Sequence, residues 1–231
     1  MRKQIIVIGH RGAKGYQPEN TMASFDYAMK LGCDFIELDV HMSSGKLFVI
    51  HDSEVDRTTN GTGNIATLSL AEIEKLDAGN GEKIPELREV LNLVSGRCGV
   101  NVELKGIGTA EPVSDLLNIA ISGGADPSDY LVSSFNHKEL SLVHKNFRRG
   151  ILFDKLPADW ADRSTGVGAW SINLAKSQIS SEIIQHAQKK GFKVLAYTAN
   201  SPNDIRTLIR AGVDGIFSDF PDRVVKQIHT Q

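Results

Sequence analysis

The sequence predicts a (β/α)8 barrel, a closed ring of eight parallel strands with helices outside it. Apolar runs typical of buried strands alternate with helix-like segments along nearly the whole chain, which favours a parallel sheet. Nine such runs occur: Ile5–Ile8, Phe35–Val40, Leu47–Ile50, Val100–Leu104, Leu131–Phe135, Ile151–Phe153, Trp170–Leu174, Val194–Tyr197 and Ile216–Phe217. Residues 41–46 are too short for a parallel crossover, so the second and third runs form an antiparallel hairpin. Eight runs then remain for the ring.

Helix patterns fill most of the gaps between these runs. Asn20–Leu31 carries its apolar residues on one helical face, and Gly32 ends it. Ser180–Lys190 and Ser201–Ala211 each begin at a serine suited to capping and stop before a glycine. An open doubly wound sheet is the alternative fold, but no Gly-rich dinucleotide turn follows the first run.

The hairpin has a consequence for the segment that follows it. The returning arm brings His51 back to about the height of Glu37, so residues 52–85 do not belong to the barrel wall. They predict a small insertion over the catalytic face, with a polar loop and a short helix at Leu70–Leu76. A helix at Glu86–Val94 then leads back to the wall. We therefore predict one domain, residues 1–231, with a β-hairpin extension of strand 2 and the insertion.

The composition excludes several classes of partner. The chain has 231 residues, is 41% hydrophobic and 23% charged, and has a net charge of -2. It therefore lacks a broad basic field for nucleic acid or an anionic membrane, and no apolar stretch approaches the ~20 residues of a membrane span. A first strand a few residues after Met1 leaves no room for a signal peptide, so we expect a cytoplasmic protein with Cys33 and Cys98 as free thiols. The choice between monomer and dimer stays open.

Three carboxylates are expected to converge at the carboxyl ends of the strands, where barrel active sites gather. Glu37 and Asp39 are two residues apart and point the same way from an extended strand. Glu103 lies at the matching level of the next strand. Such carboxylates repel one another unless a cation lies between them, and oxygen ligands favour Mg²⁺ or Ca²⁺. Separate salt bridges are the alternative interpretation.

Two histidines and two basic residues flank this predicted cation site. His10 ends the first strand and His51 ends the hairpin, so the two imidazoles can divide the roles of general base and general acid. Arg11 can hold phosphate oxygens in a forked contact. Lys105 can be a second phosphate contact or an ion-pair partner of the carboxylates. The alternative for each histidine is a packed core residue.

Aromatic residues near strand ends suggest an apolar wall for a substrate alcohol. Phe135 and Trp170 are the candidates, with ordinary packing as the alternative for each. The other histidines lie in turn or helix patterns, and we expect them at the surface: His41, His137, His144, His186 and His229.

With these residues in place, the chain resembles the glycerophosphodiester phosphodiesterase family. The likeness covers essentially the whole chain, and its strength comes from the order and spacing of several motifs. They are His10-Arg11-Gly12, Pro18-Glu19-Asn20-Thr21, Phe35-Ile36-Glu37-Leu38-Asp39, His51-Asp52, Asp56-Arg57-Thr58-Thr59, Asn101-Val102-Glu103-Leu104-Lys105, Ser133-Ser134-Phe135 and Ser218-Asp219-Phe220-Pro221.

The resemblance implies a TIM barrel enzyme that hydrolyses glycerophosphodiesters to sn-glycerol 3-phosphate and an alcohol. It implies His10 and His51 as the acid–base pair, and one divalent cation, Mg²⁺ or Ca²⁺, on the three carboxylates. In the mechanism it suggests, a glycerol hydroxyl attacks phosphorus and water then opens the cyclic ester, with His10 favoured as the first base. A lysophospholipase D acting on lysolipids and a non-catalytic phosphodiester-binding barrel are the alternatives.

The sequence departs from the family pattern in two places. The hairpin turn reads Ser43-Ser44-Gly45-Lys46 where the family usually has an Asp-Gly pair, which bears on the shape of the hairpin. Tyr197-Thr198 stands where a Trp-Thr pair is common, which bears on the pocket wall and the preferred alcohol.

Overall fold

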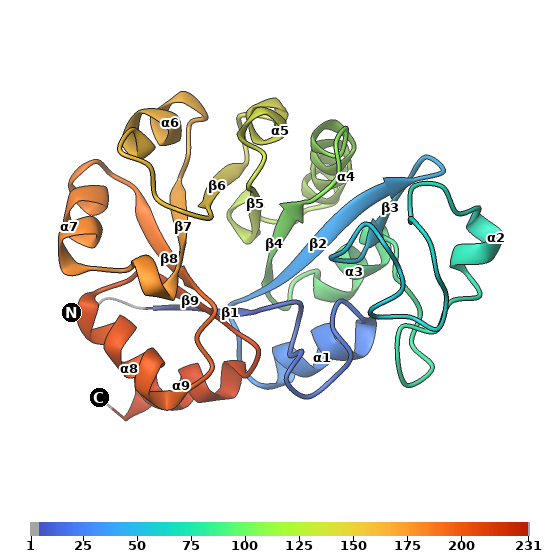
Figure 1. Cartoon of the computed structure of the whole chain (residues 1–231), viewed down its shortest axis with the longest axis horizontal. Helices are drawn as coiled ribbons and strands as arrows, with labels where there is room; N and C mark the ends of the chain where they lie inside the picture. Colours follow the sequence, from blue (N-terminus) through green and yellow to red (C-terminus); the bar gives the residue numbers. More distant parts are fainter. Residues whose placement is uncertain (1–4, 231) are drawn as a thin grey trace.

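The computed structural model describes residues 5–230 as a closed parallel barrel with one antiparallel hairpin arm (Figure 1). The sheet runs β1-β9-β8-β7-β6-β5-β4-β2-β3, and β1 also pairs with β2, which closes the ring. The ring consists of β1 (Ile6–Gly9), β2 (Phe35–Ser43), β4 (Gly99–Leu104), β5 (Tyr130–Ser134), β6 (Arg148–Phe153), β7 (Ser171–Ala175), β8 (Lys193–Tyr197) and β9 (Gly215–Ser218). The predicted fold class is therefore confirmed.

The hairpin inferred from the short connection is present. β3 (Lys46–Val49) pairs antiparallel with the upper half of β2, with Val40 opposite Val49 and Ser43 opposite Lys46. The lower half of β2 pairs in parallel with β4, so a single long strand belongs to both the ring and the arm. The turn itself uses two residues with positive φ, Ser44 at 48° and Gly45 at 75°.

Helices cover the outside of the ring. They are α1 (Met22–Lys30), α3 (Leu87–Val94), α4 (Ala110–Ser122), α5 (His137–Leu142), α6 (Trp160–Gly166), α7 (Ser181–Lys189), α8 (Pro202–Ala211) and α9 (Pro221–His229). The capping serines are as expected, since Ser180 accepts from the Ile183 amide and Ser201 from the Asp204 amide. Gly212 ends α8 at a φ of 91°, a conformation that glycine adopts without penalty.

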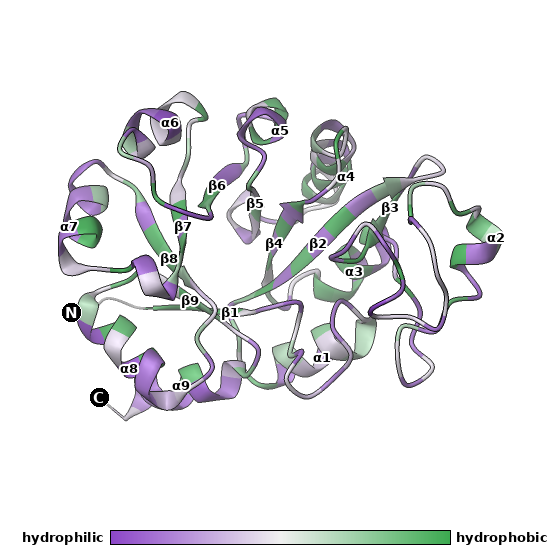
Figure 2. Cartoon of the chain, in the orientation of Figure 1, coloured by the Kyte–Doolittle hydropathy of each residue, from purple (hydrophilic) through white to green (hydrophobic). Residues whose placement is uncertain are grey.

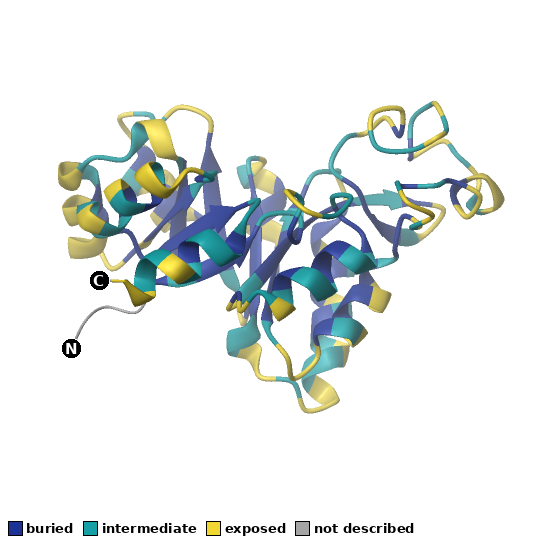
Figure 3. Ribbon diagram, turned by 90° about the horizontal axis from the view of Figure 1, so that it is seen from below, coloured by how far each residue is buried: buried dark blue, intermediate teal, exposed yellow. Residues whose placement is uncertain are grey.

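The hydrophobic core lies mainly between the strands and the helices. Figure 2 shows hydrophobic segments alternating with hydrophilic ones along the strands and helices, and Figure 3 shows the strands buried beneath partly exposed helices. A smaller apolar cluster fills the barrel interior: Ile8, Leu131, Leu195 and Phe217. Interior positions toward the carboxyl end are polar instead, which leaves a cavity there. No helix within residues 5–230 is long and apolar enough to cross a bilayer.

The predicted insertion stands beside the mouth of the barrel, next to the hairpin (Figure 1). Its helix, α2 (Leu70–Ile73), is shorter than expected. The insertion has its own apolar core, in which Val55, Ile65 and Ile73 pack against Phe48 and Ile50 of the hairpin arm. Residues 52–85 contribute none of the described side chains that line the central cavity. The insertion therefore borders the catalytic face, and it contacts residues of the site through individual side chains without lining the cavity.

Candidate active site

A cavity of about 230 Å³ opens at the carboxyl ends of the strands. It has a polar side, formed mainly by residues of the first three ring strands and the hairpin, and an apolar side from the later strands. Its lining is His10, Arg11, Glu37, His51, Asn101, Glu103, Lys105, Ser133, Phe135, Leu152, Tyr197, Thr198 and Phe217. The structure thus brings together most of the residues that the sequence singled out.

Glu37, Asp39 and Glu103 form a compact acidic cluster below the mouth of this cavity. Asp39 lies opposite Glu103 in the β2–β4 register, and ligand oxygens of the three carboxylates lie within 4.8 Å of one another. Burial, reinforced by the charges of Asp39 and Glu103, raises the pKa of Glu37. Burial and the charge of Asp39 raise the pKa of Glu103 to about 7. The ionised carboxylates repel one another at this close approach, and a bound cation would relieve that repulsion.

Neighbouring groups orient each carboxylate of this cluster. The Arg11 amide donates to Glu37 Oε2 at 2.8 Å, and the Asn20 side chain donates to Asp39 Oδ2 at 3.0 Å. Lys105 Nζ donates to Glu103 Oε1 at 3.0 Å. Within residues 5–230 these contacts leave the second oxygen of each carboxylate available as a ligand. The donor set therefore fits a hard divalent cation, which prefers oxygen ligands.

The two histidines are each held by an aspartate. His10 Nδ1 lies 2.7 Å from Asp219 Oδ1, and His51 Nδ1 lies 2.6 Å from Asp52 Oδ1. With the proton on Nδ1 and donated to the aspartate, each ring presents Nε2 as a proton acceptor. Burial lowers the pKa of both histidines, which the aspartates only partly offset. Neutral imidazoles ready to accept a proton are the result.

Asp219 and Asp52 are site residues to which sequence reasoning assigned no role. Asp219 was recognisable as a polar residue at the end of the last strand, but its pairing with His10 depends on closure of the ring. Asn200 holds the other oxygen, donating to Asp219 Oδ2 at 2.7 Å. Asp52 follows His51 directly in the chain, and that adjacency was the available signal.

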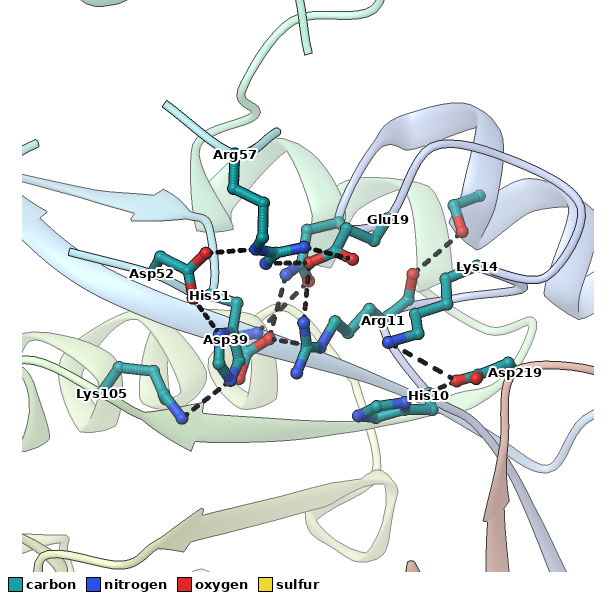
Figure 4. Close-up of polar contacts among 12 residues, drawn as sticks. His10, Arg11, Lys14, Glu19, Asp39, His51, Asp52, Arg57, Lys105 and Asp219 are labelled. Carbon is teal, nitrogen blue, oxygen red and sulfur yellow. Dashed lines mark hydrogen bonds and ion pairs between the residues drawn. The ribbon is translucent and has the colours of Figure 1, made fainter. Parts of the chain in front are cut away.

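A chain of charged contacts links the insertion to both halves of the site (Figure 4). Arg57 in the insertion donates from Nε to Asp52 and contacts Glu19 at 2.7 Å and 3.1 Å through its two terminal nitrogens. Glu19 in turn accepts from Arg11 at 2.7 Å. Although burial acts to raise it, these hydrogen bonds lower the pKa of Glu19 to about 2. Arg57 thus connects the aspartate behind His51 with the glutamate that orients Arg11.

Lys105 and Phe135 lie where the sequence predicted them, whereas Trp170 does not. Lys105 Nζ is 3.1 Å from His51 Nε2 and 5.7 Å from the centre of the Phe135 ring. Trp170 immediately precedes β7, so it lies at the amino end of the barrel, stacked 4.9 Å from the Arg148 guanidinium. The prediction that Trp170 lines the alcohol pocket is wrong. Tyr197 and Phe217 supply that part of the apolar wall.

The expectation that the remaining histidines lie at the surface is wrong for His41, His137 and His144, each of which is half-buried. His41 is half-buried in β2, with Nε2 3.0 Å from the carbonyl oxygen of His51. His137 packs edge-on against Phe153, with ring centres 5.0 Å apart. His186 and His229 are exposed, as expected.

The fold and this site together define a barrel enzyme, with two histidines and an acidic cluster at the carboxyl ends of its strands. Residues 10–223 match the model of the Glycerophosphoryl diester phosphodiesterase family. The chain belongs to this family.

Curated relatives agree with the family match. A glycerophosphodiester phosphodiesterase of Caldanaerobacter subterraneus is 38% identical to the chain, over 96% of this chain and 97% of that protein. A glycerophosphodiester phosphodiesterase of Bacillus altitudinis is 34% identical, over 95% of this chain and 96% of that protein.

Solved structures agree as well. An Oleispira antarctica phosphodiesterase, solved in complex with the product sn-glycerol-3-phosphate, superposes with a TM-score of 0.88 at 31% identity, over 97% of this chain and 96% of that one. The glycerophosphodiester phosphodiesterase of Thermotoga maritima superposes with a TM-score of 0.83 at 27% identity, over 96% of this chain and 98% of that one.

Proposed function

We propose that this protein hydrolyses glycerophosphodiesters to sn-glycerol 3-phosphate and an alcohol, with one divalent cation, Mg²⁺ or Ca²⁺, and two histidines as acid and base. The observation that carries the proposal is a single cavity that holds His10 and His51 beside the acidic cluster and beside Arg11. Membership of the family and the product named for the Oleispira relative support the substrate class.

The charges around the cavity suit this assignment. When all three are ionised, the carboxylates outnumber Arg11 and Lys105 by one, so the ionised cluster alone repels a phosphodiester anion. One divalent cation on Glu37, Asp39 and Glu103 reverses the sign and leaves a single positive charge to meet the substrate. When bound, that cation neutralises negative charge that develops on the phosphate oxygens. In this proposal Arg11, whose Nη1 also donates to Glu19, contacts the phosphate through its guanidinium.

The histidines move the protons of the reaction. Within residues 5–230 no hydrogen-bond partner occupies Nε2 of His10, whereas Lys105 contacts Nε2 of His51. His10 therefore takes the proton of the glycerol C2 hydroxyl as that oxygen bonds to phosphorus. His51 acts in the fraction of the protein in which its imidazole carries a proton, and it gives that proton to the departing alcohol oxygen as the bond between that oxygen and phosphorus breaks.

The second step reverses these roles. His51 takes a proton from the water that attacks the cyclic phosphodiester, and His10 returns its proton to the C2 oxygen as the ring opens. Asp219 and Asp52 keep both rings oriented through the two half-reactions. Both histidines end in their starting protonation states.

The activity is tested by incubating the purified protein with glycerophosphocholine and measuring release of sn-glycerol 3-phosphate. We expect release with Mg²⁺ or Ca²⁺ and none with a chelator. Glycerophosphoethanolamine and a lysophosphatidylcholine, measured in parallel, test the alcohol range and the lysophospholipase D alternative. If no divalent cation supported release of sn-glycerol 3-phosphate, the proposal would be wrong.

Arg57 is expected to matter for both halves of the site although it lies outside the cavity. Arg57→Ala removes the link between Asp52 and Glu19, so Arg11 and His51 both lose orientation. We expect about a 10-fold to 100-fold loss of kcat/KM, the usual effect of removing a partner that orients a site residue, with KM raised and kcat lowered. Lysine cannot bridge two carboxylates with a planar fork, so Arg57→Lys restores only part of the activity.

The matched control for Arg57 is Arg210→Ala, because Arg210 is exposed on α8 outside the barrel. We expect Arg210→Ala to keep wild-type kinetics. A wild-type KM and kcat in Arg57→Ala would show that the bridge does not position the site.

A further inference from the structure

The barrel interior below the acidic cluster is unexpectedly polar. Asn101 on β4, Ser133 on β5 and Asn173 on β7 occupy inward positions that barrels usually fill with Val, Ile or Leu. Their exposures are 1%, 0% and 0%. We call these three residues the polar floor. Asn101 and Ser133 line the cavity itself, and their registers place them opposite Glu37 and Glu103, respectively.

Each residue of the polar floor has a buried atom without a hydrogen-bond partner within residues 5–230. The atoms are Asn101 Oδ1, Ser133 Oγ and Asn173 Nδ2. Leaving a buried polar group unpaired costs about 1–3 kcal/mol, so these atoms need an occupant. The Asn173 orientation is set by Ser171, whose hydroxyl donates to Oδ1 at 2.8 Å and leaves Nδ2 as a donor.

The space between these side chains depends on Gly150 of β6. A Cβ atom at position 150 would lie 2.9 Å from Asn173 Nδ2 and 3.2 Å from Ser133 Cβ. The absence of a side chain therefore allows Asn173 and Ser133 to approach the same point from two strands. The floor offers one acceptor, one donor and one hydroxyl, and this set complements a single hydroxyl group, which both donates and accepts.

We propose that the polar floor binds the C1 hydroxyl of the substrate's glycerol, and that a water takes this place in the free protein. The inference rests on the proposed function, in which C3 carries the phosphate and the C2 hydroxyl attacks. Asn101 precedes Glu103 by two residues on β4, so it lies about 6–7 Å deeper along that strand than Glu103, and it is level with Glu37 across the β2–β4 pair. The glycerol chain spans the distance from the cation site to these side chains. The glycerol end then enters the barrel first, and the alcohol stays at the mouth.

This placement makes the polar floor the part of the site that distinguishes glycerophosphodiesters from lysolipids. An acyl group on the C1 oxygen removes its proton and adds a chain that the closed interior below, filled by Leu131 and Leu195, has no room for. A substrate that lacks the hydroxyl leaves the floor atoms unpaired, and sites built to bind a hydroxyl reject such analogues strongly.

The test compares glycerophosphocholine with its 1-deoxy analogue, which keeps the attacking C2 hydroxyl. We expect the wild-type protein to favour glycerophosphocholine at least about 100-fold in kcat/KM, and Ser133→Ala to reduce that ratio about 10-fold, the loss of one such hydrogen bond. The ratio does not depend on how much of a variant is folded. Ser134→Ala is the matched control, because Ser134 lies on the same strand but bonds outward to the Leu104 carbonyl oxygen, so its ratio stays at the wild-type value.

Calorimetric binding of sn-glycerol 3-phosphate and of its 1-deoxy analogue separates this inference from the proposed activity. Tighter binding of the former, weakened selectively by Ser133→Ala, supports the polar floor even if no diester is cleaved. Two results would overturn the inference and show that the floor holds only a structural water. In one, the wild-type protein turns over and binds each compound as well as its 1-deoxy analogue. In the other, Ser133→Ala weakens the binding and turnover of both compounds equally.

Discussion

Replacing His10 with alanine is expected to lower kcat by about 10²–10⁴-fold, the usual contribution of a positioned general acid or base. The imidazole is held by Asp219 at 2.7 Å, and burial keeps its pKa below the ordinary value, so it is neutral and ready to accept a proton near pH 7. Alanine removes the proton acceptor and leaves the acidic cluster intact. The KM for glycerophosphocholine is expected to change much less than kcat.

His229→Ala is the matched control for this experiment, since His229 is exposed at the end of α9. It should keep wild-type rates. His51→Ala should cost about as much as His10→Ala, and the double variant little more than either one, because residues that act as a unit are not additive. Melting temperatures of all variants verify folding. Wild-type kcat in folded His10→Ala would rule out His10 as the base.

The barrel could be predicted because its evidence is local. The short connection at residues 41–46 required an antiparallel hairpin, and β2 and β3 form one. The two-residue spacing of Glu37 and Asp39 fixed a shared face, and the adjacent strand added Glu103 at the level of Asp39. Strand period and connection length are therefore enough to assemble the acidic cluster.

The partners of the histidines and the floor of the cavity could not be read in the same way. Asp219 reaches His10 only because the last strand closes against the first, 209 positions away in the chain. Trp170 was misplaced because it begins its apolar run, so it lies at the amino end of β7, whereas the active-site residues lie at the carboxyl ends of the strands. Arg57 lies on an insertion whose position depends on its own apolar core.

A divalent cation is expected to stabilise the folded protein as well as to support turnover. The acidic cluster is buried and crowded, so a cation that binds only the folded state raises its stability by mass action. At 100 times the dissociation constant the gain is about 2.7 kcal/mol, which corresponds to a melting temperature about 5–10 °C higher for a chain of this length. Thermal melts with a chelator and with added Mg²⁺ or Ca²⁺ measure it.

The pH dependence of this gain identifies the carboxylates as the ligands. Glu103 has a pKa of about 7 in the folded protein against an ordinary value of 4.5. The cation-free folded protein therefore binds a proton that the unfolded chain releases between these values, and its stability falls as pH rises from about 4.5 to 7. A cation displaces that proton, so it competes with acid, and the gain in melting temperature should be larger at pH 8 than at pH 5.5.

Glu103→Gln tests the assignment directly, because the amide keeps the shape of the side chain and removes its charge. We expect it to abolish most of the cation-dependent gain in melting temperature and to raise the melting temperature of the cation-free protein at pH 8, where the native carboxylates repel one another. Glu74→Gln is the control, since Glu74 is exposed in the insertion. If Glu103→Gln kept the full gain, the cation would have to bind away from the acidic cluster.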